Sequence, residues 1–257
     1  MKKLLFGSVA LIALTMAESA SAADMPVKAP PTPICIWCGW YVGVNGGGGF
    51  GYDPFISTEY ISGALFTEGT WPGVGNFGTL HSSGGFGGGQ IGYNWQTGHY
   101  VYGLEADLQG AGIRGSQSAT LSYIVAPNVV TEGLTSDLDW FGTVRGRVGY
   151  AWDRFLVFAT GGLAFGEIRN SFSYIDTFGY SGSSSSSSTR AGYTVGAGVE
   201  YAFASKWSAK LEYQYIDLGT TVVGLNEFLL GGPSPYTDTA PVKETYNIFR
   251  LGLNYHL

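Results

Sequence analysis

Two groups of residues in this sequence have side chains that could perform chemistry. Cys35 and Cys38 are the only cysteines, and their C-x-x-C spacing suits a disulfide, a redox centre or half of a metal site. The second group consists of charged residues of both signs, which alternate with apolar residues along several segments. Such charges could form a buried ion-pair network, line a narrow pore or act as an acid–base pair. The compartment and the fold decide between these alternatives.

The beginning of the chain predicts export. Two lysines are followed by an apolar run that ends near Met16, and small residues at 20–22 offer a cleavage site. This order is typical of a secretory signal peptide, here residues 1–22. The apolar run is shorter than the roughly 20 residues that span a bilayer as a helix. A Pro-rich periplasmic segment, residues 23–39, is expected to follow.

The composition differs from that of a soluble domain. The chain has 41 glycines, 15% aromatic residues and only 12% charged residues, whereas soluble domains carry about 25% charged residues. Its net charge of −6 argues against nucleic-acid binding. Abundant aromatic residues without a further membrane-helix segment predict a β-rich protein whose apolar surface faces something other than water.

Period-two alternation predicts eight antiparallel strands. Short connections alternate with four long ones, among them 52–83 and 220–243, and another long connection contains the serine run 183–188, which indicates flexibility. This layout is typical of an up-and-down transmembrane β-barrel, here residues 40–257, with its short turns in the periplasm. The predicted strands are 40–51, 84–95, 100–112, 137–152, 155–168, 190–203, 207–219 and 244–257.

The alternation also assigns a direction to each side chain. In a transmembrane barrel the apolar rows face lipid and the polar rows face the lumen. Aromatic residues near the short turns are expected to form a girdle at the lipid–water interface. This predicted girdle consists of Trp95, Tyr100, Trp152, Phe155, Phe203, Trp207 and Tyr255.

The polar rows carry eight charged residues that are expected to point into the lumen. An eight-stranded barrel is just wide enough for side chains to fill, and a buried charge is tolerated only when it is paired. A packed structural network is therefore the main interpretation, and a narrow pore lining or a catalytic acid–base site are the alternatives. The residues are Glu105, Asp107, Arg145, Arg147, Glu200, Lys210, Glu212 and Arg250.

No catalytic site, cofactor or metal is predicted, so the protein is not expected to be an enzyme. His81, His99 and His256 are expected at the surface or rim, without a nucleophilic serine motif. The stretch "GGFGGGQ" lacks the following helix that a phosphate loop needs. A C-x-x-C redox motif normally opens a helix, and a structural zinc site needs four ligands. A local disulfide or an inert pair is therefore favoured for the two cysteines.

With these elements assigned, the sequence resembles the small eight-stranded surface-antigen and porin-like outer-membrane proteins of alphaproteobacteria, which have an OmpA-like transmembrane barrel. The stretch "WCGWYVG" (37–43) matches the start of that family's first strand, and "ADMPVKAPP" and the closing "FRLGLNYHL" also fit. The resemblance implies an integral outer-membrane protein of a Gram-negative bacterium. The family's last strand usually ends in Phe, which the barrel-assembly machinery reads, whereas this chain ends in Leu257.

The expected function is structural and surface-presenting, with long extracellular loops available for an unknown ligand. A small diffusion pore is the alternative, followed by a ligand-binding surface receptor or a secreted lipocalin-like carrier. The expected partners are outer-membrane lipid, lipopolysaccharide and the assembly machinery through the C-terminal strand. Aromatic residues in the loops could mark contact sites or pack on one another: Tyr60, Phe66, Trp71, Phe77, Tyr174, Phe178, Tyr180, Phe228 and Tyr236.

Overall fold

The computed structural model describes most of the chain from Cys35 to Leu257. The predicted signal peptide and residues 23–34 of the Pro-rich segment lie outside the described residues, as do Phe66 and Trp71. Within the part described, no helix is long and apolar enough to cross a membrane. The described ranges are 35–61, 64–65, 75–122, 128–229 and 232–257.

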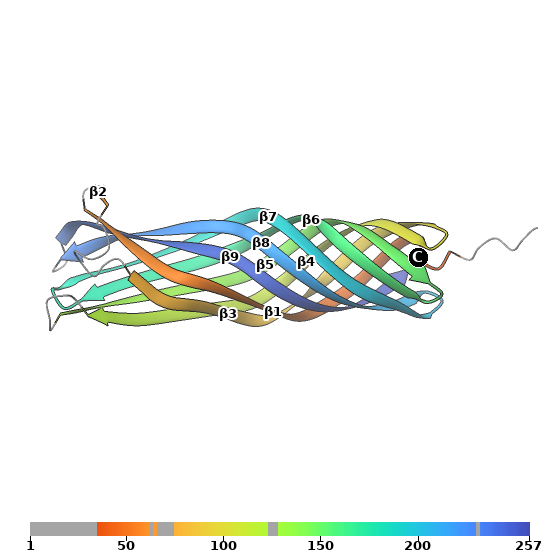
Figure 1. The fold of residues 1–257 in the computed structure, drawn as a ribbon, viewed down its shortest axis with the longest axis horizontal. Helices are drawn as coiled ribbons and strands as arrows, with labels where there is room; N and C mark the ends of the chain where they lie inside the picture. The colour runs from red at the N-terminus through yellow and green to blue at the C-terminus, as the bar shows by residue number, and fades with distance from the viewer. Residues whose placement is uncertain (1–34, 62–63, 66–74, 123–127, 230–231) are drawn as a thin grey trace, which may run out of the picture. The chain divides into compact units, whose positions relative to one another are not determined.

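Eight long antiparallel strands close into a ring, which confirms the predicted fold class (Figure 1). Each long strand pairs with its neighbours in the sequence, and β1 pairs with β9 to close the barrel. A two-residue strand, β2, pairs only with the end of β1. The strands are β1 (Gly39–Ile61), β2 (Ala64–Leu65), β3 (Gly75–Thr97), β4 (Tyr100–Ser122), β5 (Val129–Trp152), β6 (Phe155–Asp176), β7 (Tyr180–Ala204), β8 (Trp207–Leu229) and β9 (Gly232–His256).

The predicted strand lengths were wrong. The long strands have 22 to 25 residues each, because most of each predicted long loop continues the strands on either side. The serine run 183–188 lies in β7 and pairs with β6. A membrane-spanning strand needs only about 9–11 residues. About half of each strand must therefore lie beyond the bilayer.

The half of the barrel near the short turns, called here the membrane half, carries apolar side chains outside. Leu104, Leu163 and Leu251 are 58%, 67% and 66% exposed, as expected for side chains that face lipid. The seven predicted girdle residues lie on this outer face near the short turns. A second aromatic ring, not assigned from the sequence, ends the apolar belt on the other side: Phe50, Trp140, Phe165, Tyr193, Tyr213 and Phe249.

Beyond the second ring the polarity reverses. Serine and threonine residues face outward, and the inner face holds an apolar core that includes Phe55, Leu134 and Phe172. Of the predicted loop aromatics, Phe77 and Tyr174 are buried in this core, Tyr180 packs against it, and Phe178 and Phe228 are exposed; the side chains of Tyr60 and Tyr236 lie outside the description. This part of the barrel, called here the head, comprises residues 51–61, 75–82, 113–122, 129–138, 167–189, 218–229 and 232–246.

Strand pairing is incomplete in the head. The ladder between β3 and β4 ends at Ser82 and Gly115, and the ladder between β7 and β8 is interrupted over residues 182–192. A side chain bridges the second gap, since the guanidinium of Arg190 donates to the carbonyl oxygen of Thr220 at 2.5 Å. The four strands from β4 to β7 remain continuously paired. The head therefore depends on its apolar core more than the membrane half does.

We predict that Phe172→Ala destabilises the head by about 3–5 kcal/mol, because it leaves a cavity in the apolar core. Hydrogen exchange should then speed up in the head while the membrane half keeps its protection. Phe178→Ala is the matched control: its side chain is 44% exposed, and the expected change is within about 0.5 kcal/mol. Equal effects of the two substitutions would contradict a packed head.

Candidate functional site: the charged lumen

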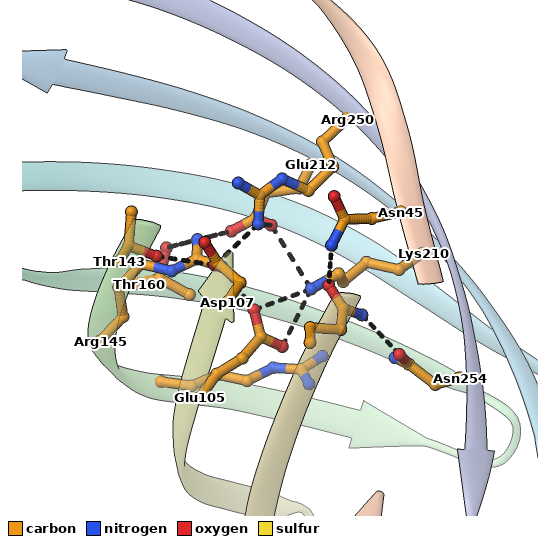
Figure 2. Close-up of polar contacts among 12 residues, drawn as sticks. Asn45, Glu105, Asp107, Thr143, Arg145, Thr160, Lys210, Glu212, Arg250 and Asn254 are labelled. Carbon is orange, nitrogen blue, oxygen red and sulfur yellow. Dashed lines mark hydrogen bonds and ion pairs between the residues drawn. The ribbon is translucent and has the colours of Figure 1, made fainter. Parts of the chain in front are cut away.

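The eight charged residues predicted for the lumen all lie on the inner face of the membrane half. Each is at most 6% exposed. Neighbouring strands present them at alternate positions, and the register places Glu105 opposite Arg145 and Glu212 opposite Arg250. Figure 2 shows the central side chains pointing toward one another across the barrel. Four acids meet four bases, so the formal charge of the network is zero.

Arg145 lies at the centre of this network. Its guanidinium donates to Asp107 at 2.8 Å and also contacts Glu105 on β4 and Glu212 on β8. Arg250 contacts the same Asp107 oxygen at 2.8 Å. The side chain of Arg145 therefore ties β5 to the far wall of the barrel, where charge-assisted hydrogen bonds are strong because water is excluded.

Lys210 completes the central group. Its ammonium donates to both oxygens of Glu105 at 2.9 Å and lies 3.5 Å from Glu212. The hydroxyl of Tyr41 donates to Glu105 at 2.7 Å. Three carboxylates and three cations balance in this central group, so the loss of one member leaves an uncompensated charge in a buried site.

A second ion pair lies nearer the short turns. Arg147 pairs with Glu200, and its guanidinium lies 4.0 Å from the centre of the Phe158 ring. Glu200 also accepts from Ser208 at 2.5 Å and from Asn254 at 2.7 Å. Lumenal charges thus extend from the central group toward the short turns.

Ser208, His256 and Glu200 resemble a hydrolase triad in composition but not in geometry. The hydroxyl of Ser208 lies 3.0 Å from His256 Nε2. Glu200 bonds to the serine, and His256 Nδ1 has no hydrogen-bond partner among the described residues. A triad needs the carboxylate on the far nitrogen of the histidine and a serine that substrate can reach. Ser208 is fully buried, so this arrangement is suited to packing.

The mouth of the barrel at the short turns is closed by the segment that holds the two cysteines. Cys35 and Cys38 form a disulfide, which is one of the two alternatives, with an inert pair, that the sequence favoured. Trp37 between them is fully buried in an apolar cluster with Leu156 and other residues from the opposite strands. Its ring meets His256 edge-on at 5.9 Å. The sequence did not indicate this role for Trp37, because nothing in the C-x-x-C pattern shows which way the intervening residues point.

Sequence reasoning also missed the uncharged polar residues of the lumen. Asn45 donates to Gln90 at 3.1 Å, and Gln90 donates to Asn254 at 2.5 Å. Gln90 ends the glycine-rich stretch "GGFGGGQ". The period-two pattern of that stretch could have indicated that the Gln90 side chain points inward. A β-carbon at Gly88 in that stretch would lie 2.0 Å from the carbonyl oxygen of Leu108. The glycine therefore allows a close approach of β3 to β4.

A separate pair of carboxyl groups lies inside the head. Glu244 accepts from Tyr246 at 2.9 Å and from Asn170 at 3.0 Å, and Asp53 accepts from Thr245 at 3.5 Å. Burial raises the pKa of Asp53 to about 7, and the nearby Glu244 adds to this rise. Burial also raises the pKa of Glu244. Sequence reasoning did not identify Asp53 as an inward-facing residue, because residues 52–83 were predicted to form a long loop.

Metal binding has no candidate in the part of the chain that the structure describes. No group of three or more His, Cys, Asp or Glu residues there could hold a metal ion. The two cysteines are joined to each other, and the lumenal carboxylates are occupied by arginine and lysine. What the arrangement can do chemically is to fill and rigidify the barrel.

Known proteins resemble this chain along most of its length. The family model described as "Outer membrane protein beta-barrel domain" matches residues 9–256. The 31 kDa outer-membrane immunogenic protein of Brucella melitensis is 37% identical over 96% of this chain and 97% of that protein. The 22 kDa outer membrane protein of Rhizobium leguminosarum is 40% identical over 62% of each chain. Among solved structures, the outer membrane protein OprG from Pseudomonas aeruginosa has 15% identity and a TM-score of 0.46, covering 86% of this chain and 97% of that one.

We predict that Arg145→Ala destabilises the barrel by about 3–5 kcal/mol, because it leaves three buried carboxylates to share only two cations, Lys210 and Arg250. Arg169→Ala is the matched control, since Arg169 forms an exposed pair with Asp139 at 3.0 Å and such pairs contribute about 0–1 kcal/mol. Urea unfolding in detergent micelles measures both. A cost for Arg145→Ala no larger than that of the control would show that the network does not stabilise the fold.

The carboxyl pair in the head predicts a dependence of stability on pH. Since the folded pKa of Asp53 is raised, the native state holds a proton that the unfolded state releases near its ordinary pKa of 3.8. Stability should therefore fall as the pH rises from there to about 7. Asp53→Asn should be more stable than the wild type above pH 7, with the difference shrinking toward pH 4. A difference that does not change with pH would contradict this.

Proposed function

The chain belongs to the outer membrane β-barrel protein family, and from that premise we propose that it is a closed barrel with a structural and surface-presenting role. Its location is the outer membrane of a Gram-negative bacterium. The observation that carries the proposal is Arg145, which is 1% exposed and held by carboxylates from β4 and β8 in the middle of the lumen.

Successive layers support a lumen without a continuous path for water. Trp37 and its apolar cluster close the periplasmic mouth. Above it lie the charged network and then a second apolar cluster that includes Phe86, Phe141 and Ile248. The apolar core of the head follows. An ion that entered from either side would have to leave its water of hydration to cross an apolar layer, which is costly.

A diffusion pore is the second candidate, because charged side chains of both signs do line the lumen. Against it, every one of the eight charges is paired, and a conducting pore needs groups that can exchange a protein partner for a passing ion. An enzymatic role has less support, since Glu200 contacts Ser208 and not His256 Nδ1. A lipocalin-like carrier would need its apolar face inside the membrane half.

Surface presentation would fall to the head. Ile175, Phe178 and Phe228 are 58%, 44% and 46% exposed near the far ends of β6, β7 and β8. The Brucella relative is named an immunogenic outer-membrane protein, which is in keeping with a part exposed to the exterior. The surface available to a ligand would then be the far ends of these strands. They would take the place of the long loops expected from the sequence.

Assembly into the membrane would depend on the last strand. Phe249, Leu251, Leu253 and Tyr255 continue the lipid-facing row of β9, and Leu257 follows it with 71% of its surface exposed. The assembly machinery would therefore meet the alternating apolar row of β9.

Single-channel recording from the detergent-purified mature protein in a planar bilayer tests the closed barrel. We predict no reproducible conductance steps from a protein shown to be folded by its heat-modifiable migration. A known porin in the same bilayer serves as the positive control. Reproducible steps whose ion selectivity changes in Glu105→Gln would mean that ions pass the network, and the closed-barrel proposal would fail.

A further inference from the structure

The outer face of β4 changes its chemistry in three steps as the strand leaves the membrane. The strand begins at a periplasmic turn, and its first outward residues are apolar and exposed. Glycines, one arginine and then serines follow in that order on the same face. The outward residues are Leu104, Leu108, Gly110, Gly112, Arg114, Ser116 and Ser118.

The first step is a shelf of bare backbone, called here the glycine shelf, on the lipid side of β1, β3 and β4. Strand register sets Gly46 opposite Gly87 and Gly87 opposite Gly110. A β-carbon at Gly87 would come no closer than 3.7 Å to another atom, and one at Gly110 would meet nothing within 4 Å. A β-carbon at Gly46 would lie 3.2 Å from the carbonyl oxygen of Phe86. The barrel therefore has room for larger side chains at Gly87 and Gly110, and packing within the chain does not account for glycine at these two positions.

The second step is an arginine without a protein partner. Arg114 is exposed and forms no hydrogen bond or ion pair with any residue in the described ranges. Its neighbours across the strands are Ser83 on β3 and Asp137 on β5. Arg169, on the same face of β6, is held by Asp139 at 3.0 Å. Arg114 is therefore free to bind an anion at the upper edge of the glycine shelf, and a guanidinium binds phosphate through two parallel hydrogen bonds.

The third step is a trough of about 510 Å³ across the outer face of β4 to β7. Hydroxyl groups dominate its lining, and Ser116, Thr135, Ser171 and Ser185 follow one another in register across the four strands. No charged residue lines it. Hydroxyls both donate and accept hydrogen bonds, so an uncharged array of them suits a ligand that is itself rich in hydroxyl groups.

We propose that this surface binds a phosphorylated, acylated glycolipid of the outer leaflet. Its acyl chains would lie on the glycine shelf, a phosphate on its acylated disaccharide would bind Arg114, and the sugars attached beyond that disaccharide would enter the hydroxyl trough. The order of these features along β4 is the order of acyl chain, phosphate and sugar from the membrane outward. A phospholipid would leave the trough empty. The inference goes beyond the closed barrel and does not depend on it.

Binding of defined lipids to the full mature protein in mild detergent tests this site. The probes are lipopolysaccharide, bisphosphorylated lipid A, dephosphorylated lipid A and phosphatidylglycerol. We expect Arg114→Gln to weaken binding of lipopolysaccharide and of bisphosphorylated lipid A by about tenfold, the loss of one charge-assisted contact. Arg169→Gln, the matched control, should change binding by less than about twofold, since its guanidinium is already paired.

A second variant separates the sugar contact from the phosphate contact. Ser116→Tyr fills the trough from an exposed position, so it should weaken binding of lipopolysaccharide and leave bisphosphorylated lipid A unchanged. Heat-modifiable migration verifies that each variant is folded. The proposal is overturned if phosphatidylglycerol binds as tightly as lipid A, if Arg114→Gln binds like the wild type, or if native mass spectrometry finds a dimer without glycolipid.

Discussion

The structure depends on one buried guanidinium, that of Arg145, and on the carboxylates from two walls of the barrel that surround it. A membrane half that turns its apolar side chains toward lipid must fill its interior with what remains, which is glycine and polar residues. Those polar residues can be buried only if their charges cancel and their hydrogen bonds are made. The charges cancel among three acids and three bases joined through Arg145 and Lys210, and in the separate pair of Arg147 and Glu200. These contacts connect opposite strands of the barrel.

Beyond the bilayer the same strands have the opposite arrangement of polar and apolar faces. Once the outer face meets water, the apolar side chains turn inward, and Phe55, Leu134 and Phe172 form a core like that of a soluble sheet protein. In β6 and β9 period two is kept through this change, so these strands pass from a polar interior to an apolar one without a shift. In β5 and β8 a bulge at the boundary, between Leu138 and Trp140 and between Asp217 and Thr220, moves the inward positions by one residue. The buried carboxyl pair of Asp53 and Glu244 lies beyond this boundary.

The sequence predicted the membrane half well and the head poorly. In the membrane half, lipid and lumen impose a sharp contrast between faces, so the alternation around Glu105 and Arg145 revealed both strands and directions. In the head, small hydroxyl residues such as those of 183–188 face water. The two faces of the strand then differ little in polarity, so the sequence pattern predicts a loop. The inward turn of Trp37 depends on contacts with distant strands, which no local pattern records.

The central claim, that Arg145 and its carboxylates hold the barrel together as a unit, is tested most directly by a double-mutant cycle. The free energy of unfolding in micelles is measured for the wild type, Arg145→Met, Glu212→Gln and the double variant. A shared network predicts a coupling of about 1–3 kcal/mol, with the double variant more stable than the sum of single losses implies. Additivity within about 0.5 kcal/mol would contradict the claim, because it would mean that the two side chains act independently.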